Sequence, residues 1–169
     1  MITALTILSA LIIAAYTVAV CIKCKGIPYS ISETYYKISH KFWFGVTMVL
    51  TACLLMPAIL EITPNSYQFM AFLACLGMIM TGIAPNFRKG IEKKIHTTGA
   101  VLCLVFSQVW VGLTCPWMLL VWVGYLVYTI VMMIKNWNGY FTGTFLGTKT
   151  MFWVEITALL TTYVTLLII

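Results

Sequence analysis

Five polar residues near the ends of apolar segments carry the side chains that acid–base chemistry uses. Histidine and glutamate commonly transfer protons in catalysis, and serine is a common nucleophile. The candidate polar cluster consists of Ser32, Glu33, His40, His96 and Glu155. Two histidines and a carboxylate could also hold a metal ion, but both histidines are expected beside water, where they need no such role. We therefore predict no metal and no other cofactor.

Glu155 lies deepest within an apolar segment, about one and a half helical turns after its start at Thr150. A carboxylate at that depth is costly unless it is paired, protonated or hydrated. Thr157, Thr161 and Thr165 follow at four-residue spacing and share one helix face, which is typical of helix packing. We expect Glu155 to point into the fold and to meet a polar group. Its candidate partners are His96, His40 and the serines and tyrosines of residues 27–41.

The composition excludes a soluble domain. Of the 169 residues, 62% are hydrophobic and 8% are charged, whereas soluble domains carry about 25% charged residues. Lipid must therefore serve as the outer solvent of this chain. The net charge of +6 resides in short loops and not on a folded basic surface, so no nucleic-acid partner is expected. Cys21 and Cys24 form a C-x-x-C pair, but a zinc site would need a second pair.

The apolar segments predict the fold class. A membrane-spanning helix needs about 20 predominantly apolar residues. Segments of about that length occupy residues 2–22, 42–60, 67–84, 95–113, 116–134 and 150–169. The sequence therefore predicts an all-α fold, a polytopic transmembrane bundle of six helices that forms a single domain over residues 1–169. The three glycines between residues 135 and 149 are interpreted as turn residues.

The basic residues predict the orientation of this bundle. All ten lie in or beside the first, third and fifth loops, which share one side of a six-helix protein. The positive-inside rule places these loops in the cytoplasm and both termini outside, as in a plasma membrane or a bacterial inner membrane. Each cation gains about 1 kcal/mol near an anionic leaflet, which predicts contacts with anionic lipid. The candidate headgroup residues are Lys23, Lys25, Lys37, Lys41, Arg88, Lys89, Lys93 and Lys94.

Two short polar motifs stand at predicted membrane boundaries: Pro-Tyr-Ser-Ile-Ser-Glu-Thr at residues 28–34 and His-Thr-Thr-Gly-Ala at residues 96–100. They resemble the Pro-Tyr-Ile-Ser-Asp-Thr-Gly and His-x-x-Gly-Ala motifs of the DRAM/Sfk-type six-helix membrane proteins. In this sequence Ser30 is an extra residue, Glu33 replaces Asp, and Tyr35 stands where Gly is expected. The resemblance implies a six-helix protein linked to autophagy, GPI-lipid remodelling or lipid organisation. It also implies motif loops that face away from the cytosol, whereas the lysines here place them inside.

Three functions are compatible with the sequence. The leading hypothesis is a multi-pass membrane protein without enzymatic activity that binds lipid or a partner through its cytoplasmic loops. That partner is either another membrane protein or a second copy of the chain. The first alternative is a small transporter or channel subunit that uses Glu155. The second is a lipid-modifying enzyme that uses the histidine, glutamate and serine cluster.

Overall fold

The computed structural model describes residues 2–88 and 90–169, and this part of the chain is 80% helical and contains no strand. The elements in chain order are α1 (Ile2–Lys23), α2 (Thr34–Lys37), α3 (Phe42–Ile62), α4 (Gln68–Ile83), α5 (Gly90–Thr114), the 3₁₀ turn η1 (Pro116–Leu119), α6 (Leu120–Lys135), α7 (Phe141–Gly147) and α8 (Thr150–Ile168). The predicted all-α class is confirmed for the described residues.

Five helices are long and apolar enough to cross a membrane: α1, α3, α5, α8, and η1 together with α6 (Pro116–Lys135). The sixth predicted segment forms α4, which has only 16 residues. At 1.5 Å per residue α4 spans about 24 Å, less than the roughly 30 Å of a hydrocarbon core. Pro85 follows shortly after it, and the residue before a proline disfavours helical geometry. The structure therefore shows five candidate spans and does not establish the sixth.

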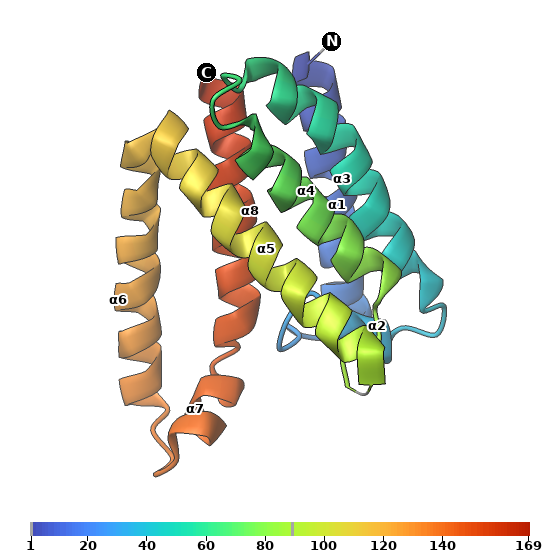
Figure 1. The fold of residues 1–169 in the computed structure, drawn as a ribbon. Helices are drawn as coiled ribbons and strands as arrows, with labels where there is room; N and C mark the ends of the chain where they lie inside the picture. Colours follow the sequence, from blue (N-terminus) through green and yellow to red (C-terminus); the bar gives the residue numbers. More distant parts are fainter. Residues whose placement is uncertain (1, 89) are drawn as a thin grey trace.

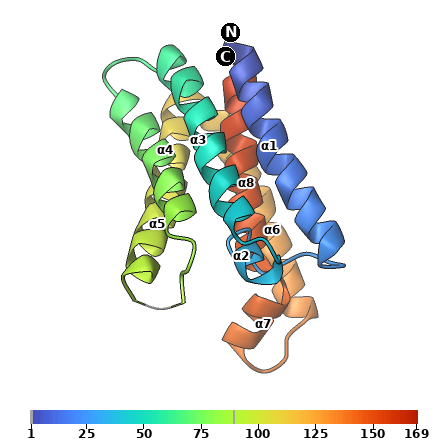
Figure 2. The ribbon, with the colours of Figure 1, turned by 90° about the vertical axis from the view of Figure 1, so that its right-hand side faces the viewer.

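The two termini lie at the same end of the bundle, whereas α2, α7 and the start of α5 lie at the other end (Figures 1 and 2). The described lysine and arginine residues all belong to segments at that second end. These segments are the last turns of α1 and α6, the first turns of α3, α5 and α8, and the loops beside them, including α2. The structure thus gathers the described cations at one end of the bundle.

Glycine lets α3, α4 and α5 approach closely. A methyl group added to Gly77 of α4 would lie 2.5 Å from the Gly99 carbonyl oxygen and 2.5 Å from the Cys103 nitrogen of α5. On the opposite face of α4, a methyl group on Gly45 of α3 would lie 2.7 Å from the Gly82 carbonyl oxygen. Small residues of this kind permit backbone contact between membrane helices, where van der Waals packing drives association.

The long helices differ in how deeply their side chains are buried. Trp110 of α5 is fully buried at the terminus end of the bundle, where its indole N–H donates to the Thr63 hydroxyl at 2.7 Å. Ser9 of α1 and Tyr163 of α8 share a hydrogen bond of 2.6 Å in the same region. By contrast, α6 has no buried residue, and it contacts α5 and α8 through Trp122, which donates to Gln108 at 2.8 Å, and Tyr128, whose ring lies 5.8 Å from that of Trp153.

Two boundary predictions are wrong. The helix predicted from residue 95 already begins at Gly90, because the charged residues before Ile95 continue the helix beyond the apolar segment. The segment interpreted as turns contains α7, which includes Gly143 and Gly147. Of the three glycines in this segment, Gly139, with a φ of +88°, takes the left-handed conformation expected of a turn glycine.

Candidate functional site

Two hydrogen bonds, each donated by a backbone N–H, join the loop after α1 to the start of α8. The Phe152 N–H, one of the first-turn donors that a helix leaves unpaired, donates to the Tyr29 carbonyl at 2.9 Å. The Ile31 N–H donates to Oε2 of Glu155 at 2.5 Å. Glu155 thus has a polar partner on another element, as expected, but the partner is a backbone amide and not a histidine, serine or tyrosine side chain.

Glu33 stabilises the same loop from within. Its carboxylate accepts the Tyr29 N–H at 2.7 Å, and its own N–H donates to the Ser30 hydroxyl at 3.0 Å. The two bonds hold Glu33 to two successive residues of the loop, Tyr29 and Ser30. Glu33 also pairs with Lys37 at 3.3 Å near the surface. Burial and the negative charges of Glu155 and Glu33 raise the pKa of the Tyr29 phenol above its ordinary value.

His96 bridges three elements near this loop. Its Nε2 lies 3.1 Å from the Ser32 hydroxyl, and its Nδ1 lies 3.0 Å from the carbonyl oxygen of Ala84, which follows α4. The imidazole is buried, and the Phe44 and Phe87 rings lie 6.3 and 5.0 Å from it between centroids. The ring is therefore held in one orientation by hydrogen bonds at both nitrogens and by aromatic neighbours.

The five residues of the predicted polar cluster do not all meet. Ser32 and His96 are in direct contact, and Glu33 and Glu155 bind the residues just before Ser32. His40 instead lies exposed before α3, with its ring 6.4 Å from that of Phe42. No group of three or more histidine, cysteine or acidic residues in residues 2–88 and 90–169 is placed to hold a metal ion.

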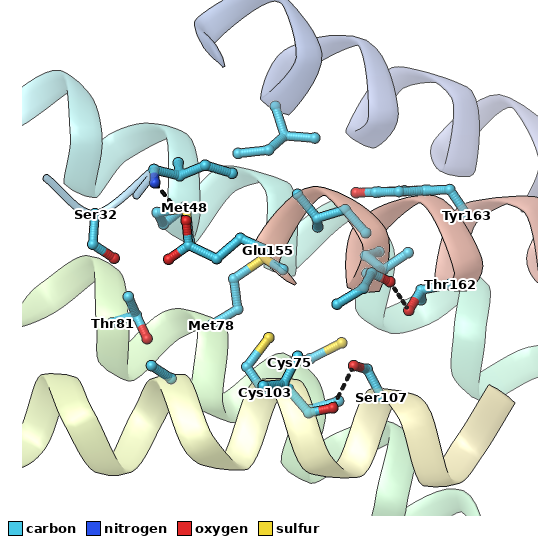
Figure 3. A pocket seen from close by; sticks show the side chains of 18 of the residues that line it. Ser32, Met48, Cys75, Met78, Thr81, Cys103, Ser107, Glu155, Thr162 and Tyr163 are labelled. Atoms are coloured by element: carbon cyan, nitrogen blue, oxygen red, sulfur yellow. Dashed lines mark hydrogen bonds between the residues drawn. The ribbon is translucent and has the colours of Figure 1, made fainter. Parts of the chain in front are cut away.

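A cavity of about 100 Å³ opens beside Ser32 and Glu155 and extends between α1, α3, α4, α5 and α8. Ser32, Thr81 and the Glu155 carboxylate lie together at one end of it (Figure 3). Most of its wall is apolar. The apolar and sulfur-containing lining includes Ile13, Met48, Leu55, Ile59, Cys75, Met78, Cys103, Leu104 and Leu159. This wall could not be identified from the sequence, because these residues carry no signal beyond hydrophobicity.

Three hydroxyl groups in the cavity wall donate to carbonyl oxygens of their own helices. Thr81 donates to the Gly77 carbonyl at 2.9 Å, and Ser107 donates to the Leu104 carbonyl at 3.1 Å. Thr162 donates to the carbonyl oxygen of Ala158 at 2.8 Å. The Tyr163 hydroxyl, at the other end of the cavity, is hydrogen-bonded to Ser9 of α1. Ser32 and Glu155 are bound by other segments at the polar end, through His96 and the Ile31 N–H.

The cations of the predicted headgroup site surround this end, but several already have partners. Lys23 donates to Ser39 at 3.1 Å, while Arg88 lies 4.0 Å from the centroid of the Tyr36 ring and Lys41 lies 5.4 Å from that of Tyr35. Lys37 pairs with Glu33, as described above. The side chains of Lys25, Lys93 and Lys94 are exposed. Lys89 lies outside the described residues.

Comparisons of the chain with models of known protein families, with curated proteins and with solved structures find no match. Function must therefore be argued from the site itself.

Proposed function

We propose that this chain is a multi-pass membrane protein that binds one amphiphilic molecule in the cavity beside Glu155. The observation that supports the proposal is the asymmetry of the cavity: its wall is apolar, and Glu155 and Ser32 stand at one end. Small-molecule sites combine apolar walls with a few placed polar groups in this way. The cavity lies between helices that include four of the five candidate spans, which supports a lipid, or a molecule like one, as its occupant.

The volume and the polar end define the class of ligand. One water needs about 10–15 Å³ of such space, so a cavity of about 100 Å³ admits a chain of several carbons and not a whole phospholipid. A carboxylate can accept about four hydrogen bonds, and Ile31 supplies one to Glu155. The ligand is therefore a single aliphatic chain whose head carries hydroxyl or amine donors.

The same proposal places the polar end of the cavity at the cytoplasmic interface. The described cations gather at that end, which the positive-inside rule assigns to the cytoplasm. The exposed Lys25, Lys93 and Lys94 then stand where anionic headgroups lie, and each gains about 1 kcal/mol there. A ligand would enter from the inner leaflet with its head beside Ser32 and its chain toward the termini.

The test is binding of a radiolabelled medium-chain 1-O-alkylglycerol, which has a hydroxyl head and no cleavable ester, to the purified chain in detergent micelles. Ala100→Phe places a ring in the cavity, because Ala100 forms part of its lining. Ala15→Phe is the matched control, because Ala15 is exposed on α1. We expect Ala100→Phe to weaken binding at least about tenfold, or about 1.4 kcal/mol, and Ala15→Phe to leave it unchanged.

Thermal unfolding of both variants shows whether each is folded. Equal affinities in the two folded variants, or no binding by the unaltered chain, would refute the proposed site. Retention of the alkylglycerol by the unaltered chain in native mass spectrometry would support it independently of either substitution.

A further inference from the structure

The contact between Ser32 and His96 has the geometry of a nucleophile with its base. Oγ of Ser32 and Nε2 of His96 are 3.1 Å apart, although the residues are 64 positions apart in the chain. Both residues are buried, with 8% and 5% of their surfaces exposed. A serine becomes nucleophilic when a neighbouring base within about 2.6–3.2 Å accepts its proton.

The second nitrogen of His96 fixes the direction of this hydrogen bond. Nδ1 lies 3.0 Å from the Ala84 carbonyl oxygen, which can only accept. In the neutral imidazole the proton therefore resides on Nδ1, and Nε2 presents its lone pair to the Ser32 hydroxyl. A base that is oriented by a third group in this way is the arrangement on which catalytic triads depend.

Ser32 faces the cavity, whereas His96 is not among the residues that line it. A molecule in the cavity would therefore contact the Ser32 hydroxyl but not the His96 imidazole, which lies outside the cavity lining. The neighbouring backbone N–H groups are already hydrogen-bonded: that of Ile31 donates to the Glu155 carboxylate, and that of Glu33 donates to the Ser30 hydroxyl. Among the described residues the Ser32 N–H donates to no acceptor, so it is available to stabilise an oxyanion.

We propose that Ser32 and His96 are a nucleophile and its general base, which cleave a single-chain acyl ester bound in the cavity. This inference rests on the proposed function, because the cavity holds the acyl chain. Ser32 Oγ forms a bond to the acyl carbon as its proton passes to Nε2 of His96. The bond from that carbon to the alcohol then breaks, and the alcohol leaves with the proton.

Water completes the cycle. A water molecule attacks the acyl-serine and gives a proton to His96, the bond between Ser32 Oγ and the acyl carbon breaks, and His96 returns the proton to Oγ. The products are a fatty acid and an alcohol. Glu155 acts in this scheme as a positioning residue, because its carboxylate holds the Ile31 N–H immediately before the nucleophile.

The test is covalent labelling of the purified full chain in micelles by a medium-chain alkyl fluorophosphonate. In this reaction the bond from Ser32 Oγ to phosphorus forms, the phosphorus–fluorine bond breaks, and fluoride leaves while His96 takes the proton. Peptide mass spectrometry should place the adduct on Ser32. This result on the unaltered chain does not depend on how any variant folds.

Variants separate catalysis from a structural role. Ser32→Ala should abolish labelling, and His96→Asn, which keeps a side-chain donor for the Ala84 carbonyl, should slow it at least about 100-fold. Ser66→Ala is the matched control, because Ser66 is exposed in the loop between α3 and α4 and does not line the cavity. Its labelling should equal that of the unaltered chain.

The outcomes distinguish this inference from the proposed function. Alkylglycerol binding without any adduct on Ser32 would overturn the nucleophile assignment and leave ligand binding intact. An adduct formed with the small reagent diisopropyl fluorophosphate in a chain that binds no alkylglycerol would support the Ser32–His96 pair and refute the acyl-chain site. Labelling that persists unchanged in Ser32→Ala would overturn the inference outright.

Discussion

The Ile31 N–H donates to the Glu155 carboxylate at 2.5 Å, although the two residues are 124 positions apart. The bond joins the loop after α1 to the first turns of α8, and the neighbouring bond from Phe152 to the Tyr29 carbonyl lies beside it. Together they hold the loop against α8, and Ile31, Ser32 and Glu155 line the cavity there. The position of Ser32 therefore depends on a helix that lies far away in the sequence.

Loss of the Glu155 carboxylate should destabilise the fold through the donor that it leaves unpaired. Glu155→Ala removes the acceptor of the Ile31 N–H, and a buried donor without a partner costs about 1–3 kcal/mol. Glu155→Gln keeps an amide oxygen at the same place and should lose less stability. Thermal unfolding in detergent measures the difference. Equal losses in the two variants would show that the hydrogen bond contributes nothing.

Glycine-to-alanine substitutions should have opposite effects on two helices. At Gly77 the added methyl group would lie 2.5 Å from backbone atoms of α5, so Gly77→Ala should push α4 and α5 apart and cost about 1–3 kcal/mol or more. At Gly124 of α6 nothing lies within 4 Å, and Gly124→Ala should stabilise the helix by up to about 1 kcal/mol. Unfolding temperatures of the two variants test this, and a neutral Gly77→Ala would contradict the close packing.

Reporter fusions should show the proposed orientation. A reporter after Ile169 is expected to be non-cytoplasmic, and one inserted within residues 87–94 is expected to be cytoplasmic, because the cations gather at that end. The measurement is the activity of paired reporters that work on only one side of the membrane. A cytoplasmic C-terminus would show that the charge rule misassigns this chain, or that the 16-residue α4 does not cross.

The stability of the chain should fall at alkaline pH through Tyr29. Burial, Glu155 and Glu33 raise the pKa of this phenol in the folded chain, so the unfolded chain loses the proton first. The neutral phenol contributes its stability fully below the unfolded pKa of about 10, and this contribution is lost as the pH rises through the folded pKa. Tyr29→Phe should flatten the fall in unfolding temperature above pH 10. Parallel curves for the two proteins would show that Tyr29 does not contribute.

Helices were predictable from the sequence because hydrophobicity reports them directly. The predicted segments 2–22 and 42–60 correspond to α1 (Ile2–Lys23) and α3 (Phe42–Ile62) within two residues at each end. The prediction failed where hydrophobicity and helix formation diverge. The first turn of α5 is charged, and the short helix α7 lies in a segment rich in glycine.

The site was only half predictable. Glu155 was identifiable because a carboxylate within an apolar segment is costly, and Ser32 and His96 stood in polar motifs. Their partners were not identifiable, because the Ile31 N–H and the Ala84 carbonyl are backbone groups that every residue type offers. His40 has the same chemistry as His96 but lies exposed. His96 differs from it in its hydrogen bonds at both ring nitrogens and in its packing against Phe44 and Phe87, and these are features of the fold.

The hydrogen bonds between α8 and the loop after α1 can form only late in biosynthesis, after α8 has been made. The ribosome completes the loop that carries Ser32 long before it makes Phe152 and Glu155, which hold that loop. Before α8 is made, the cavity therefore lacks the part of its wall that α8 supplies, and the Ile31 amide lacks the Glu155 acceptor. We expect a nascent chain stalled before α8 to be inserted and yet unable to retain a ligand, so that competence for binding arises only when α8 arrives.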